Sequence, residues 1–342
     1  MEREYIILGG SGYFGSNFIH NLLKDGSNNK IIINIDMVKS SNRTLKKVKH
    51  YYYLPYNLTN TNNVDRIAKR IADVERNIFN KPGCTYTLDN LVLPKRILIN
   101  FAAQSFVDTS ISSPEQTLEN NVNIVLNMLK ISEKIKFDDI IHISTDEVHI
   151  LNKKDIRDVS AYALSKKICE DILLKISSKH DIGENKVFKI VRPVNLYGVI
   201  DKDKKYGLWQ KNKCIITRLI DAYKYPDTDF DLYLSESTRH FINIQRACDT
   251  LMKIVNDDID ETRIYLMKYD FHMVIKDLIL IFIDRYSIKN INIIDDNLRG
   301  RYEDDGYGIP EMKKYDKFEI DDFWKMMDWM ILDEKMDFNM KK

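Results

Sequence analysis

The segment Gly9-Gly10-Ser11-Gly12-Tyr13-Phe14-Gly15 carries the strongest structural signal in this chain. It lies between an apolar run, Tyr5–Leu8, and a helical repeat over Phe14–Lys24, and it satisfies both G-x-x-G-x-x-G and G-x-G-x-x-G. Glycines allow a tight turn, close approach of the backbone to a pyrophosphate, and close packing of helix on strand. The helix N-terminus then offers free N–H groups to the phosphates. The segment therefore predicts a dinucleotide-binding turn.

An acidic residue follows this turn at the spacing typical of a dinucleotide site. Asp36 ends the second apolar run, Ile31–Ile35, and lies 21 residues after Gly15. Its carboxylate can accept hydrogen bonds from both hydroxyls of the NAD ribose and would repel the 2′-phosphate of NADP. Arg43, seven residues farther on, is a weaker sign of NADP. We therefore expect NAD, and a purely structural turn is the alternative.

Short apolar runs alternate with helical patterns over the first 198 residues. The runs predict strands at Tyr5–Leu8, Ile31–Ile35, Tyr53–Tyr56, Ile97–Ala103, Asp139–Ser144 and Val187–Arg192. The patterns between them predict helices at Phe14–Lys24, Val64–Phe79, Glu115–Ile135 and Ala161–Ser178. This alternation, with strands that are apolar throughout, predicts an α/β fold with a Rossmann-like, doubly wound parallel sheet.

The pattern changes after residue 198 and predicts a smaller C-terminal α+β lobe. Helices are expected at Cys214–Tyr223, Ala247–Val255, Val274–Tyr286 and Phe323–Leu332, and strands at Asp231–Leu234, Phe241–Ile244 and Ile291–Asp295. We expect residues 1–198 to bind the dinucleotide and residues 199–342 to bind the substrate, with some exchange of segments. Asn80–Lys95, which contains two prolines and a glycine, predicts an inserted surface loop.

Composition excludes several classes of protein. The 342 residues include 52 Lys and Arg against 51 Asp and Glu, so a net charge of +1 provides no global field for nucleic acid or an anionic membrane. The four cysteines contain no C-x-x-C pair and the seven histidines are dispersed, which argues against disulfides and a metal site. The first strand begins within about four residues of Met1, so we expect no signal peptide and a cytoplasmic protein. Abundant Asn, Ile and Lys indicate a genome of low GC content, from a microbe or a large DNA virus. If the source is viral, we expect the protein in the host cytoplasm.

Two groups of residues in the first half have the chemistry of a catalytic site. Tyr162 and Lys166 form Y-x-x-x-K at the start of a helix, so the ammonium is expected to lie beside the phenol, lower its pKa and make it a general base. Asp146 and Glu147 follow a predicted strand at the sheet edge where α/β folds bind ligands. One protonated and one ionised carboxyl group could there expel a hydroxyl and accept a proton. A solvated turn with a helix cap is the alternative for the acid pair.

Together these residues resemble the extended short-chain dehydrogenase/reductase family, and within it the nucleotide-sugar 4,6-dehydratases. Ser144-Thr145-Asp146-Glu147-Val148 matches the S-T-D-E-V of these dehydratases, whereas epimerases usually differ there. Phe101–Asp108 resembles their A-A-E-S-H-V-D segment, and Asn195–Gly198 resembles N-N-Y-G. The similarity covers residues 3–255 well and the rest loosely.

The resemblance implies a closed redox cycle on an NDP-hexose, with no net use of NAD. Tyr162, assisted by Thr145, would take the proton of the sugar O4 as C4 transfers hydride to NAD. Glu147 would then remove the proton of C5 and Asp146 would protonate the departing O6, after which the hydride returns to C6. Lys166 would hold the nicotinamide ribose. The product would be the 4-keto-6-deoxy sugar, and reprotonation of C5 from either face would add 5-epimerase activity.

The resemblance also implies the binding residues. Those expected at the cofactor are Gly9, Gly12, Tyr13, Phe14, Gly15, Asp36, Asn57, Leu58, Phe101, Ala102, Ala103, Ser105, Asn120, Tyr162 and Lys166. Those expected at the nucleotide sugar are Ser105, Thr145, Asn195, Lys213, Tyr233, Arg239 and Arg299. No metal is implied.

The chain departs from the dehydratase pattern near the expected sugar site. His149 and Ile150 replace the usual Tyr-Gly, Phe106 stands where a histidine is common, and only about a dozen residues separate Val148 from Tyr162. Asn57-Leu58 replaces the usual Asp-Ile beside the adenine. These changes favour UDP-N-acetylglucosamine, while dTDP-glucose and UDP-glucose stay open. A sugar 4-epimerase and a non-catalytic NAD sensor are the alternative functions.

The two longest helices of the first half suggest a homodimer. Family members pair the equivalents of Glu115–Ile135 and Ala161–Ser178 across a two-fold axis. Their apolar positions exceed what one sheet face needs, so we expect part of this surface to meet a second copy. These positions are Leu118, Val122, Val125, Leu126, Leu129, Ile168, Ile172 and Leu173. Cover by the second lobe or by Asn80–Lys95 is the alternative.

Overall fold

A computed structural model describes residues 3–24, 29–38, 50–79, 94–105, 107–152, 159–177, 186–198, 214–295 and 320–332. The predicted insertion falls largely on residues 80–93, outside this part of the chain. None of the helices described is both long and apolar enough to cross a membrane.

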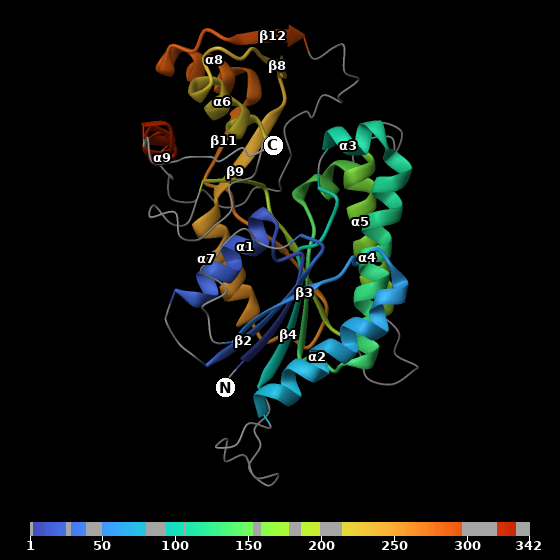
Figure 1. The fold of residues 1–342 in the computed structure, drawn as a ribbon. Coiled ribbons are helices and arrows are strands. Elements are labelled where there is room, and N and C mark those ends of the chain that lie inside the picture. Colours follow the sequence, from blue (N-terminus) through green and yellow to red (C-terminus); the bar gives the residue numbers. More distant parts are fainter. Residues whose placement is uncertain are drawn as a thin grey trace.

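A parallel sheet of seven strands forms the centre of the larger part of the molecule (Figure 1). Its order is β10-β6-β5-β4-β1-β2-β3. The strands are β1 Arg3–Leu8, β2 Lys30–Asp36, β3 Tyr51–Pro55, β4 Lys95–Asn100, β5 Asp139–Ile143, β6 Phe188–Arg192 and β10 Arg263–Leu266. Strands β2 and β3 lie on one side of β1, and β4, β5 and β6 lie on the other. The carboxyl ends of the paired strands β1 and β4 therefore form the switch point where ligands bind in such sheets. The prediction of a doubly wound α/β fold is confirmed.

Helices cover both faces of the sheet. One face packs against α1 (Tyr13–Leu23) and α7 (Ile244–Val255). The other packs against α2 (Val64–Phe79), α4 (Pro114–Lys134) and α5 (Ala161–Ser177). The strands between them are almost completely buried, for example β1 and β5, and this explains why they read as continuous apolar runs.

Short elements at the carboxyl ends of the strands connect the sheet to its helices. They are η2 Thr61–Asn63, α3 Val107–Ser112 and η4 Asp146–Asn152. The sequence patterns did not predict α3, β10, β7 (Asn195–Tyr197) or β11 (Phe271–Val274), because each is short and lacks a clear period.

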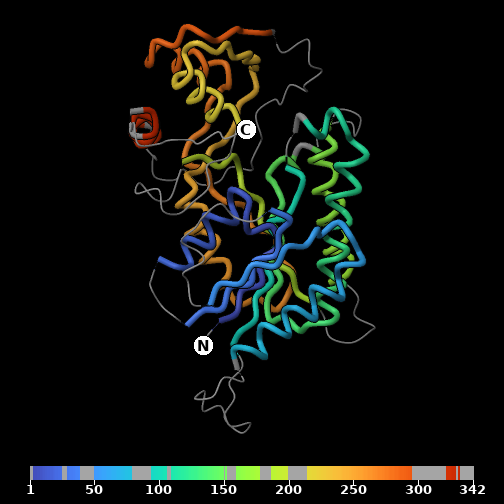
Figure 2. The backbone as a smooth tube through the Cα atoms, viewed as in Figure 1, coloured from blue at the N-terminus to red at the C-terminus, as the bar shows by residue number. Residues whose placement is uncertain are grey.

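A smaller lobe lies beyond the carboxyl ends of the strands, and the N-terminus lies at the opposite end of the sheet (Figure 2). It contains the sheets β11-β9-β7 and β12-β8. Its own core is formed by α6 (Ile215–Lys224), α8 (Ile275–Tyr286) and α9 (Ile320–Leu332). The strands are β7 Asn195–Tyr197, β8 Phe230–Leu234, β9 Thr238–Asn243, β11 Phe271–Val274 and β12 Ile291–Asp295.

Segments cross between the two parts in both directions. Helix α7 and strand β10 follow residue 198 but pack on or join the large sheet, and β10 is parallel to β6. Strand β7 precedes residue 198 but pairs with β9 of the lobe. The lobe is thereby held to the sheet along β7, next to the ends of β5 and β6.

Candidate active site

The glycine turn places three backbone segments in contact. A Cβ on Gly9, which has φ +75°, would lie 2.5 Å from the backbone of Ala102, and one on Gly15 would lie 2.7 Å from the carbonyl oxygen of Gly9. Gly12 precedes the first residue of α1. Only glycine allows this approach of β1, α1 and the end of β4. The turn therefore has the compact backbone that a pyrophosphate site requires.

Asp36 lies against this turn at the carboxyl end of β2, as predicted. One carboxylate oxygen accepts from the N–H of Ser11 at 2.9 Å and the other from the N–H of Val38 at 3.1 Å. The carboxylate is half-exposed, so its remaining lone pairs can accept from ribose hydroxyls. The residues present fit an NAD whose pyrophosphate lies at α1 and whose adenosine ribose lies at Asp36.

The end of β4 forms the other wall of the turn. The N–H of Phe101 donates to the carbonyl oxygen of Leu8 at 2.8 Å, and its ring meets the ring of Phe14 edge-on at 5.1 Å. Ala102 covers Gly9, while Ala103 is half-buried and Ser105 is exposed.

Three predicted cofactor residues pack on or hydrogen-bond to neighbouring segments. Asn57 accepts from the N–H and the hydroxyl of Thr59, each at 2.9 Å, and the side chain of Leu58 is buried in the core. Both follow β3, beside the strand that carries Asp36. Asn120 donates to the side-chain oxygen of Gln104 at 2.8 Å, so it acts on the segment after β4 from α4.

Asn121 was missed by the sequence analysis and ties this segment to the catalytic helix. Its amide oxygen accepts from the N–H of Gln104 at 2.7 Å, and its amide nitrogen donates to Ser165 Oγ at 2.8 Å. Ser165 lies on α5 between Tyr162 and Lys166. A buried amide inside an amphipathic helix is the sequence signal that could have identified it.

The acid pair begins η4, directly after β5. The N–H of Asp146 donates to the carbonyl oxygen of Pro193 at 3.1 Å, which fixes the turn, and Thr145 Oγ1 donates to the Asp146 carboxyl at 3.4 Å. Burial, and next the charge of Glu147, raise the pKa of Asp146 to about 8, although Arg239 acts in the opposite direction. Asp146 therefore holds a proton at neutral pH beside the half-buried Glu147.

Tyr162 stands close to this pair, but its acidity differs from the expectation. Burial and the charge of Glu147 raise the pKa of Tyr162 well above its usual value, while a hydrogen bond with Thr145 lowers it in part. Lys166 instead donates to the carbonyl oxygen of Ile143 at 2.7 Å, and burial lowers its pKa to about 8. The prediction that Lys166 lowers the pKa of Tyr162 is therefore wrong for this structure.

A buried ion pair between Glu170 and Arg192 is hydrogen-bonded to Ser144, two residues before the acid pair. Glu170 accepts from Ser144 Oγ and from Arg192 Nε at 2.9 Å, and Arg192 also lies 3.4 Å from His149 Nε2. Glu170 follows Lys166 by four residues on the same face of α5, so its position could have been read from the sequence. Next to it, Asn100 Nδ2 donates to Nδ1 of the buried His142 at 3.1 Å, and the Asn100 oxygen accepts from Ala102 N–H.

The residues predicted for the nucleotide sugar are only partly gathered here. Asn195 is exposed on β7 and donates to the carbonyl oxygen of His240 at 3.0 Å. Arg239 lies on β9, close enough to Asp146 to act on its pKa, and Tyr233 lies on β8. Outside the described residues are Lys213, Arg299, Phe106 and residues 153–158 of the short loop.

Comparison with known proteins identifies the family. The sequence profile of the NAD dependent epimerase/dehydratase family matches residues 5–211. The chain belongs to this family. Its cofactor is therefore NAD, and its fold agrees with that of solved members.

The chain is similar to both dehydratases and epimerases of this family. It matches a DesIV dTDP-glucose 4,6-dehydratase double mutant from Streptomyces venezuelae (TM-score 0.70, 16% identity, 96% of this chain and 97% of that chain). It also matches a UDP-N-acetylglucosamine 4-epimerase from Methanobrevibacter ruminantium (TM-score 0.66, 16% identity, 96% and 97%). A curated relative, the low-salt glycan biosynthesis protein Agl12 of Haloferax volcanii, is 29% identical over 146 residues, which are 43% of this chain and 40% of that protein. The chain thus aligns with less than half the length of that relative, and these likenesses do not separate the two activities.

Asp36 should determine the choice of cofactor. Because its carboxylate accepts from ribose and repels a 2′-phosphate, we expect tighter binding of NADH than of NADPH, and Asp36→Ala should narrow the difference by about tenfold or more. Fluorescence titration with both dinucleotides measures this. Equal affinity of the unaltered protein for the two would contradict the assignment.

Proposed function

We propose that this chain is an NAD-dependent nucleotide-sugar 4,6-dehydratase, which forms the 4-keto-6-deoxy sugar from an NDP-hexose with loss of water. The observation that carries the proposal is the buried Asp146 beside Glu147, with Thr145 hydrogen-bonded to both Asp146 and Tyr162. Burial raises the pKa of Asp146 to about 8, which favours its protonated form. Elimination of water across C5 and C6 needs a proton donor for the departing O6 and an acceptor for the C5 proton. A neutral and an ionised carboxyl group side by side provide both.

Each residue of the site has a role in this reaction. Bound NAD would supply a hydride acceptor for C4 and, once reduced, a hydride donor for C6, and its cationic nicotinamide ring would favour ionisation of a nearby phenol. Tyr162 takes the O4 proton, assisted by Thr145, and Lys166, directed by the Ile143 carbonyl, holds the nicotinamide ribose. The new 4-keto group makes the C5 proton acidic, so the Glu147 carboxylate can remove it while Asp146 protonates O6.

A sugar 4-epimerase is the second candidate, since epimerases share the fold. 4-Epimerisation needs Tyr162, Lys166 and NAD, but it needs neither the proton donor nor the base that Asp146 and Glu147 would provide. Burying Asp146 against Glu147 costs free energy that such an enzyme would have no reason to retain. The same argument counts against a non-catalytic NAD sensor. Reprotonation of C5 from either face would give additional 5-epimerase activity.

Among substrates we favour UDP-N-acetylglucosamine over dTDP-glucose and UDP-glucose. From the sequence, Phe106 in place of a histidine and the short connection from Val148 to Tyr162 are expected to give a bulky C2 substituent more room and fewer polar partners. We place the protein in the cytoplasm, or in the cytoplasm of a host if the chain is viral. We assign binding of the nucleotide and its diphosphate to residues of the lobe and of the segment preceding it. These residues are Asn195, Lys213, Tyr233, Arg239 and Arg299.

We also propose a homodimer through α4 and α5, which pack side by side (Figure 1). The structure assigns several of the predicted apolar positions to the core: Val125, Leu129 and Leu173 are buried. Leu126 and Leu174 remain exposed at 37% and 36% on these two helices. These exposed leucines are therefore the residues to test, whereas a charge at Val125 would mainly disrupt the fold.

A panel of UDP- and dTDP-hexoses tests the proposed reaction. With one or more of them the unaltered protein should yield a product lighter by one water, and Glu147→Gln should dehydrate about 10²–10⁴ times more slowly, because C5 then lacks its base. Mass spectrometry measures the product, and absorbance of NADH shows whether the variant stalls after oxidation of C4. Dehydration by Glu147→Gln at the parent rate would contradict the role of Glu147.

The acidity of Asp146 should be visible in the pH dependence of dehydration. Because its pKa is about 8, the proton needed by O6 is present below that pH and is lost above it, so kcat/KM should fall as pH rises through about 8. Asp146→Asn should be slower at every pH and should lack this alkaline limb. A pH–rate profile from about pH 6 to about pH 9 measures it, and an identical limb in the variant would assign the pKa to another group.

Charge on the exposed face of α4 should weaken the dimer. We expect Leu126→Asp to shift the protein towards the monomer in light scattering at micromolar concentration. Leu280→Asp is the matched control, since Leu280 is an exposed leucine on α8, away from this face. A monomeric mass for the unaltered protein, or an unchanged dimer in Leu126→Asp, would count against this interface.

A further inference from the structure

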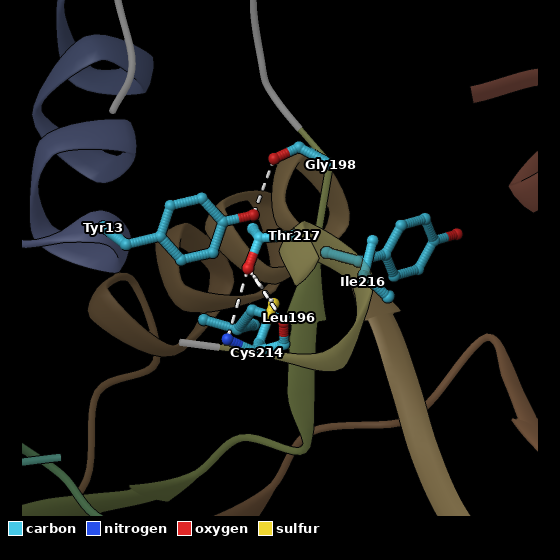
Figure 3. Close-up of a pocket in the computed structure, with 7 residues that line it drawn as sticks. Tyr13, Leu196, Gly198, Cys214, Ile216 and Thr217 are labelled. Atoms are coloured by element: carbon cyan, nitrogen blue, oxygen red, sulfur yellow. Dashed lines mark hydrogen bonds between the residues drawn. The ribbon is translucent and has the colours of Figure 1, made fainter. Parts of the chain in front are cut away.

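The phenol of Tyr13 joins two segments that lie 185 residues apart in the sequence. Tyr13 is the first residue of α1, directly after the glycine turn, and its hydroxyl donates to the carbonyl oxygen of Gly198 at 2.6 Å (Figure 3). Burial raises the pKa of Tyr13 well above its usual value, so the phenol keeps its proton and stays a donor. The bond is therefore a persistent link between the cofactor turn and the segment after β7.

The acceptor is held in a conformation that favours glycine. Gly198 has φ +89°, and a Cβ there would lie 3.1 Å from Asn243 Nδ2. The preceding residues of β7 are fixed to β9, and Tyr197 donates to Asp270 at 3.3 Å. The position of the Gly198 carbonyl thus depends on the packing of the lobe. Through its hydrogen bond to that carbonyl, Tyr13 links the glycine turn to the lobe.

Tyr13 also lies between the N-terminal ends of two helices. With Gly198 it lines a small hollow, whose other walls include Leu196, Cys214 and Thr217 at the start of α6. Thr217 Oγ1 accepts from the Cys214 N–H at 3.3 Å and caps that helix. Because helix N-termini attract phosphate, the start of α1 at the glycine turn suits the pyrophosphate of NAD. Asn195 of the proposed nucleotide site lies on β7, three residues before Gly198.

We propose that Tyr13 couples the binding of the cofactor to the binding of the nucleotide part of the substrate. The inference rests on the proposed function, because it takes the second ligand to be a nucleoside diphosphate group. NAD bound at the turn would fix the phenol, and the hydrogen bond would then fix Gly198 at the end of β7, the strand that carries Asn195. Such coupling is reciprocal, so a nucleotide bound at the lobe must in turn retain the cofactor. Tyr13 is a positioning residue in this scheme.

The rate of cofactor release tests the coupling without any turnover. The full chain is loaded with NADH and mixed with excess NAD, with and without UDP or dTDP, and the loss of NADH fluorescence is followed. We expect the nucleotide to slow release from the unaltered protein by about 2- to 10-fold, the range that one hydrogen bond supplies. In Tyr13→Phe the ring is kept and only the hydroxyl is lost. The ratio of the NADH release rates without and with nucleotide should therefore fall towards one.

Tyr51→Phe is the matched control. Its hydroxyl accepts from Asn34 at 3.0 Å, and Asn34 in turn donates to Ser11 of the glycine turn, so the substitution also removes a phenol bond near the turn. Tyr51→Phe leaves the hydrogen bond from Tyr13 to Gly198 intact, so the ratio of release rates should equal that of the unaltered protein. A ratio in Tyr13→Phe equal to that of the unaltered protein would overturn the coupling alone. Failure of UDP and dTDP to bind the unaltered protein would overturn the proposed substrate class and the coupling with it.

Discussion

The backbone of Ala102 lies where a side chain on residue 9 would have to be. This close approach brings the ends of β1 and β4 and the start of α1 together, and a Cβ on Gly9 or Gly15 would separate them. The other contacts of the site extend from this point. Asp36 packs on the turn through Ser11, Ala102 is held by Asn100, and Asn100 donates to His142, which is close enough to Lys166 to feel its charge. The cofactor turn and the catalytic helix are therefore parts of one connected structure.

Burial, more than pairing of opposite charges, sets the acidity of the catalytic groups. It is the largest cause of the raised pKa values of Asp146 and Tyr162 and of the lowered pKa of Lys166. The result suits an elimination, since Asp146 starts with the proton that the departing hydroxyl needs. The ion pair of Glu170 and Arg192 stabilises the turn that presents Asp146 without neutralising it.

The sequence predicted those features that depend on neighbouring residues. The glycine turn, Asp36, the strand endings and the helices of the larger part follow from local spacing and apolar periodicity, and the family assignment agrees with them. Strand β10 was missed because its place in the sheet depends on pairing with β6. The raised pKa of Tyr162 was missed because burial is a tertiary property, and Lys166 was misjudged because a backbone carbonyl competes for its ammonium. The bond from Tyr13 to Gly198 joins residues with no shared pattern.

The closed transfer of hydride from C4 to C6 is the central claim, and an isotope label follows it directly. A nucleotide sugar carrying deuterium at C4 is incubated with the protein, and the product is examined by NMR and mass spectrometry. If the chain is a 4,6-dehydratase as proposed, one bound NAD would accept and return the same hydride, and deuterium is expected at C6 of a 4-keto-6-deoxy sugar that has lost water. Deuterium recovered at C4 of a product of unchanged mass would contradict the account and identify a 4-epimerase.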